Sequence, residues 1–63
     1  MFKVIAKYQR PNYKWETTTT GPFIMKEEAD KMHKKQSYIA HELMAENKII
    51  DYLIVTIETF KAS

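Results

Sequence analysis

The feature that most constrains this chain is a stripe of mostly apolar side chains between residues 25 and 47. They recur at alternating steps of four and three residues, the period of one helix face. The stripe consists of Met25, Ala29, Met32, Gln36, Ile39 and Leu43. No Gly or Pro interrupts the segment, and Asn47 suits the left-handed conformation that ends many helices. The pattern predicts one helix over residues 25–47, whose stripe the rest of the chain must cover.

Three other segments have the alternation or the β-branched composition of strands, at residues 2–9, 13–20 and 49–60. Pro11 and Asn12 supply turn chemistry between the first two, which predicts a hairpin. The order strand, strand, helix, strand predicts an α+β (β-β-α-β) domain, with one long helix on a three-stranded antiparallel sheet of order 2-1-3. We expect the 63 residues to form a single domain.

Alternation also predicts which side chains face the helix. The expected helix-facing set is Val4, Ala6, Tyr8, Trp15, Leu53, Val55 and Ile57. The opposite face of the sheet would then present Ile5, Ile50, Tyr52, Ile54 and Phe60, bracketed by Lys3 and Lys7. A soluble monomer rarely leaves so large an apolar surface exposed, and the third strand would be an unprotected sheet edge.

This surface predicts contact with a partner, either a second copy in a homodimer or another protein. The expected contact residues are Ile5, Tyr52, Ile54 and Phe60, with Lys3 and Lys7 at the rim. Tyr38 points outward from the helix and is a further candidate, because an exposed tyrosine can anchor a protein partner.

Composition argues against several classes of function. The sequence has no cysteine, which removes disulfides, thiolate metal sites and thiol nucleophiles, and one glycine, too few for a Gly-rich phosphate loop. His33 and His41 lack a carboxylate or thiol at metal-ligand spacing, so we expect no cofactor and no enzymatic activity. Lysines interrupt the apolar N-terminus and no apolar run could span a membrane, which predicts a cytoplasmic protein without a membrane partner.

Nucleic-acid binding is the alternative function. A net charge of +2 is too balanced to indicate it, but basic residues gather in the first hairpin at Lys3, Lys7, Arg10 and Lys14. Aromatic residues that could stack on bases lie between them. Alternation places Tyr8 and Trp15 on the helix-facing side, however, so rings and charges would point to opposite sides of the sheet. Protein binding is therefore the favoured prediction.

Two resemblances bear on function. The segment Gly-Pro-Phe-Ile-Met-Lys-Glu-Glu-Ala at residues 21–29 resembles the strand-to-helix junction of sporulation-related repeat domains, which bind peptidoglycan glycan strands. It departs from that family at Met25, where the family places a helix-capping Ser. In size and element order the chain resembles small phage-encoded proteins that bind and inhibit one host protein, such as antitoxins and anti-defence inhibitors. That resemblance implies a protein-binding module that inhibits or modulates a host or partner protein.

Overall fold

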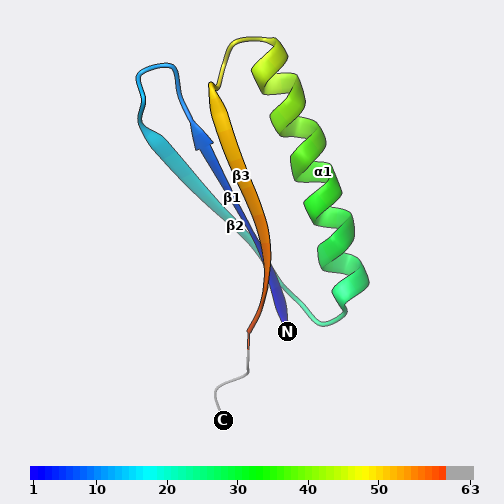
Figure 1. Ribbon diagram of the computed structural model, residues 1–63. Coiled ribbons are helices and arrows are strands. Elements are labelled where there is room, and N and C mark those ends of the chain that lie inside the picture. Colours follow the sequence, from blue (N-terminus) through cyan, green and yellow to red (C-terminus); the bar gives the residue numbers. More distant parts are fainter. Residues whose placement is uncertain (60–63) are drawn as a thin grey trace.

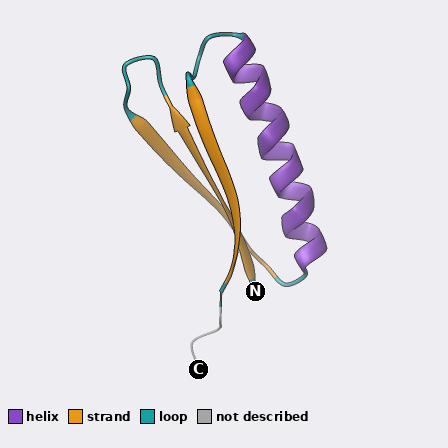
Figure 2. Ribbon diagram, viewed as in Figure 1, coloured by secondary structure: helices purple, strands orange, loops and turns teal. Residues whose placement is uncertain are grey.

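The computed structural model describes residues 1–59, which form the elements β1 (Phe2–Gln9), β2 (Trp15–Phe23), α1 (Lys26–Ala45) and β3 (Asp51–Glu58). The strands make one antiparallel sheet of order β2-β1-β3, and α1 lies along one of its faces (Figure 1). The predicted fold class and strand order are confirmed. The β1–β2 turn and the α1–β3 loop lie at one end, and the N-terminus and β2–α1 connection at the other (Figure 2).

The ends of α1 differ from each other. Met25 precedes the helix in extended conformation and forms no side-chain cap. It is exposed rather than part of the stripe, because it lies before the first helical turn. At the other end Asn47 has a left-handed φ of 59° and donates its N–H to the Met44 carbonyl at 3.0 Å. The Lys48 N–H donates to the Leu43 carbonyl at 2.9 Å, completing a Schellman motif, as the sequence predicted for Asn47.

The core lies between α1 and the strands β1 and β3. Val4 and Ala6 of β1 are buried, as are Ala29 and Ala40 of α1. The absence of longer side chains at these two alanines lets the helix backbone approach the sheet. The half-buried members of the helix stripe are Met32, Gln36, Ile39 and Leu43. Within residues 1–59 no helix combines the length and the apolar character needed to cross a membrane.

The amide of Gln36 lies in the middle of this apolar stripe and is paired with a side chain of the sheet. The Tyr8 hydroxyl donates to Gln36 Oε1 at 2.6 Å. Burial raises the pKa of the Tyr8 hydroxyl, because the anion would lose its hydration there. The bond satisfies a polar group that would otherwise destabilise the core.

Candidate functional site

The side chains of β3 that face α1 are those that were predicted to point away from the helix. Directly paired residues of neighbouring strands share a face, and buried Ala6 pairs with Ile54. The Tyr52 hydroxyl lies 3.1 Å from His41 Nε2 of α1. Tyr52 and Ile54 are therefore on the helix-facing side, and their predicted outward position is wrong. The predicted contact residue Phe60 lies outside the described residues.

The loop after α1 explains this reversal. Ile49 is buried, and the chain bends at Ile50 before β3 begins at Asp51. Because β3 is apolar on both faces, its sequence does not fix which face is covered. A shift of one residue in the loop exchanges the two faces of the whole strand. The prediction that Leu53, Val55 and Ile57 lie under the helix is wrong for the same reason.

Trp15 also lies on the face opposite to the predicted one, because of the β1–β2 turn. The Tyr13 N–H donates to the Arg10 carbonyl at 2.8 Å, and the Arg10 N–H to the Lys14 carbonyl at 2.9 Å. Tyr13 has a left-handed φ of 68°. This arrangement is a type I turn followed by a left-handed residue, one of the common hairpin connections. It pairs Trp15 with Gln9, so the indole faces away from α1.

We define the outer face as the sheet surface turned away from α1. It consists of Lys3, Ile5, Lys7, Gln9, Trp15, Thr17, Thr19, Asp51, Leu53, Val55 and Ile57. The register places Ile5 between Thr19 and Val55, in the middle of this face. Three apolar residues of β3 are substantially exposed there: Leu53 by 53%, Val55 by 36% and Ile57 by 38%. An apolar column thus follows β3, beside a column from β1 in which Ile5 separates two lysines.

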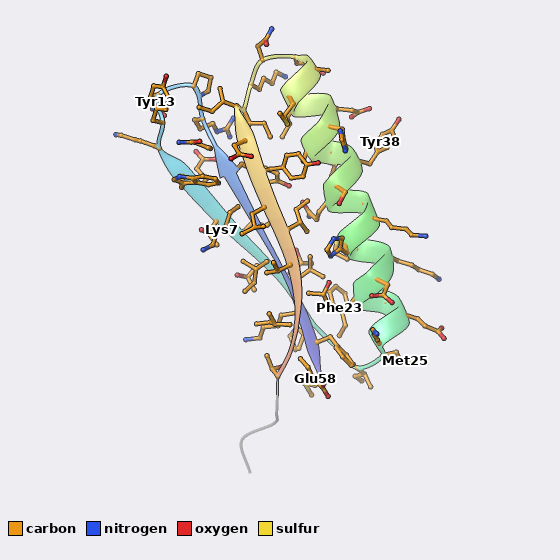
Figure 3. All side chains as sticks on the ribbon, in the orientation of Figure 1. Lys7, Tyr13, Phe23, Met25, Tyr38 and Glu58 are labelled. Carbon is orange, nitrogen blue, oxygen red and sulfur yellow. The ribbon has the colours of Figure 1, made fainter. Side chains whose placement is uncertain are left out.

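The outer face also contains a shallow pocket of about 330 Å³, lined by Lys7, Trp15, Thr17 and Leu53. Trp15 is 50% exposed at its wall. Figure 3 shows Lys7 projecting from the side of the sheet away from α1. Within residues 1–59, neither Lys3 nor Lys7 forms an ion pair. The carboxylate of Asp51 accepts the Tyr52 N–H at 2.8 Å. The outer face therefore combines an exposed apolar column on β3 with two lysines on the central strand.

The remaining candidate residues are separated from this surface. Arg10 forms an ion pair with Glu16 at 2.9 Å, and Lys14 lies in the turn between β1 and β2. Of the basic residues predicted for nucleic-acid binding, the structure thus brings Lys3 and Lys7 together on the outer face. Tyr38 is 67% exposed and projects from the side of α1 away from the sheet (Figure 3).

β3 forms an edge of the sheet, as predicted. In the described part of the chain it pairs with β1 alone. The Thr59 N–H donates to the Met1 carbonyl at 2.7 Å, and the Met1 ammonium to the Thr59 carbonyl at 3.1 Å. Because bonding alternates along an antiparallel pair, even-numbered residues of β3 direct their backbone groups to the free edge. The Asp51 side chain already accepts the Tyr52 N–H, so the donors from Ile54 onward remain available.

Sequence reasoning missed Trp15, Leu53, Val55 and Ile57 as members of the exposed surface. A signal was available for Trp15, because a turn of Pro11, Asn12 and one left-handed residue sets its pairing with Gln9. For β3 the sequence contains no comparable signal, since both of its faces are apolar.

Among the described residues, no three His, Cys, Asp or Glu side chains are grouped so that they could hold a metal ion. Comparison with protein families, with curated proteins and with solved structures finds no match for this chain. The resemblance to phage-encoded inhibitors therefore stays a prediction.

Proposed function

We propose that this domain binds another protein through its outer face and thereby inhibits or modulates that partner. The observation that carries the proposal is the contiguous exposed column of Leu53, Val55 and Ile57 beside Ile5 and Trp15. Apolar patches of this kind on small proteins mark interaction sites, because covering them removes unfavourable contact with water. A folded domain bound in this way would block the surface of the partner that it covers.

The outer face is a better candidate than the exposed side of α1. There Tyr38 is exposed amid charged residues, and single exposed aromatic side chains are common on monomeric proteins. On the outer face, Trp15 lines a pocket next to aliphatic neighbours. In protein complexes most of the binding energy comes from a few residues, often an aromatic side chain at a pocket that the partner shields from water.

The test compares two variants that add the same charge on opposite sides of the molecule, Leu53→Glu and Tyr38→Glu. The immobilised wild type and both variants are used to capture proteins from an extract of the organism that encodes the chain. Circular dichroism first establishes that each variant is folded. We expect a protein that the wild type and Tyr38→Glu retain and that Leu53→Glu loses. A partner lost only by Tyr38→Glu would contradict the proposal.

One observation favours a second candidate function, the binding of single-stranded nucleic acid. Trp15 shares the outer face with Lys3 and Lys7, so a base could stack on the indole while the lysines contact phosphates. The aliphatic column of β3 has no role in such a complex, and we therefore rank nucleic-acid binding second.

Trp15, the single tryptophan of the chain, provides the assay for this candidate. Oligodeoxythymidylate would quench its fluorescence, and two phosphate contacts would give a slope of roughly −1.4 for log affinity against log salt. Unchanged fluorescence at low salt would exclude nucleic-acid binding at this face.

A further inference from the structure

We infer that the occupant of the outer face is an amphipathic helix of a partner protein, with acidic side chains along its apolar stripe. This inference rests on the proposed function and specifies the chemistry of the partner. It replaces the second copy of this chain that the sequence suggested as one possible occupant.

The dimensions of the sheet favour a single helix. Three strands about 4.8 Å apart present a surface roughly 10 Å wide, which matches the diameter of one α-helix. The other face of this sheet is covered in that way by α1. An extended peptide added to the edge of β3 would satisfy backbone groups but would leave Leu53, Val55 and Ile57 facing water. A helix lying along β1 and β3 would cover all three.

The charges of the outer face argue against a second copy and for an acidic partner. Lys3 and Lys7 flank Ile5 on the central strand and have no ion-pair partner among the described residues. Stacking two outer faces would bring these lysines against an equally basic surface, and like charges oppose association. Asp51 supplies one negative charge on this face against the two positive charges of Lys3 and Lys7, so it offsets the excess only in part.

The spacing of the lysines indicates where the acidic groups would lie. Four residues along a strand separate Lys3 from Lys7 by roughly 13 Å. The same distance along a helix corresponds to about nine residues. Residues nine apart lie on opposite sides of a helix, whereas residues seven apart share a side and lie about 10.5 Å from each other, so two carboxylates seven residues apart could reach both lysines through the flexible lysine stems. At the Lys7 end of this row, an apolar side chain would enter the pocket formed by Lys7, Trp15 and Leu53, with the lysine stem as part of its wall.

The probe is a synthetic helical peptide of about eighteen residues, the number that spans the sheet at 1.5 Å per residue. It has one leucine stripe, with two glutamates about seven residues apart on one side of the stripe and alanines elsewhere. A matched peptide has lysines in place of the glutamates. Binding is followed by the fluorescence of Trp15, which lies on the outer face.

We expect the wild type to bind the glutamate peptide about tenfold more tightly than the lysine peptide, with a preference that weakens in salt. Lys7→Glu should reverse this preference. Lys34→Glu makes the same charge change at an exposed position of α1 and should leave the preference intact. A preference retained by Lys7→Glu, or lost equally in both variants, would overturn the inference.

Other outcomes separate this inference from the proposed function. Equal binding of both peptides, or binding of neither, refutes the acidic helix while the capture experiment with Leu53→Glu still stands. Sedimentation equilibrium should find a monomer; a dimer that Leu53→Glu dissociates would show that a second copy occupies the outer face and would refute the inference. Tighter binding of oligodeoxythymidylate than of the glutamate peptide would refute it in favour of nucleic acid.

Discussion

Two neighbouring substitutions in β3 distinguish the observed orientation of this strand from the reverse one. Ile54 is half-buried on the helix-facing side, opposite buried Ala6, whereas Leu53 is 53% exposed on the outer face. Threonine is β-branched and therefore suits a strand at either position. The variants Ile54→Thr and Leu53→Thr therefore differ chiefly in which environment receives the hydroxyl.

The expected difference in stability is large for so small a domain. Ile54→Thr removes methyl and methylene contacts at about 0.8 kcal/mol per group and places a hydroxyl beneath α1, for a total of about 2–3 kcal/mol. A chain of 63 residues has a free energy of unfolding of about 3–9 kcal/mol, so this loss is a substantial fraction of it. Leu53→Thr exposes its hydroxyl to water and should change the free energy of unfolding by no more than about 0.5 kcal/mol.

Thermal unfolding followed by far-ultraviolet circular dichroism measures this difference. At about 4–8 °C per kcal/mol, Ile54→Thr should lower the Tm by at least about 8 °C, and Leu53→Thr by a few degrees at most. Each variant is measured at two protein concentrations, so that any contribution from self-association is visible as a dependence on concentration. A larger loss for Leu53→Thr than for Ile54→Thr would refute the observed orientation of β3.

Three further predictions concern the backbone and the core. Gly21 has a φ of 126°, and an added Cβ would lie 3.0 Å from the Phe2 carbonyl oxygen. Gly21→Ala should therefore lower the free energy of unfolding, measured with urea, by about 1–3 kcal/mol. Tyr13→Asn should instead raise the free energy of unfolding by up to about 1 kcal/mol, because asparagine tolerates the left-handed φ better. Tyr8→Phe removes the bond to Gln36 and should cost about 1 kcal/mol at neutral pH. Burial raises the pKa of the Tyr8 hydroxyl in the native state, so the stabilising effect of this hydroxyl is complete below pH 10 and is lost as the pH rises through the native pKa. The difference in free energy of unfolding between the wild type and Tyr8→Phe, measured with urea at several pH values, should therefore shrink above pH 10.

The fold could be predicted from local patterns because each acts over a short stretch of chain. The stripe of α1, the Asn47 terminus and the alternation of β1 each depend on near neighbours, and all three agree with the structure. The strand order followed because a helix between two strands returns the chain along the sheet.

The composition of the outer face could not be predicted in the same way, since it depends on the phase of two strands. Side chains alternate with a period of two, so one residue in a turn decides whether Trp15 faces α1 or water. The left-handed Tyr13 determines this phase for β2, and the bend at Ile50 determines it for β3. The structure does have an exposed apolar surface on this side of the sheet with Ile5 at its centre, but most of the other residues of that surface differ from the predicted ones.

The most direct test of the outer face as the contact surface is a map of backbone amide chemical shifts in the ¹⁵N-labelled protein during titration with the glutamate peptide. We expect saturable shifts concentrated at Ile5, Lys7, Leu53 and Val55, with little change along the exposed side of α1. Shifts concentrated around Tyr38 would contradict the outer face as the contact surface, and the absence of saturable shifts would refute the acidic helix as its occupant.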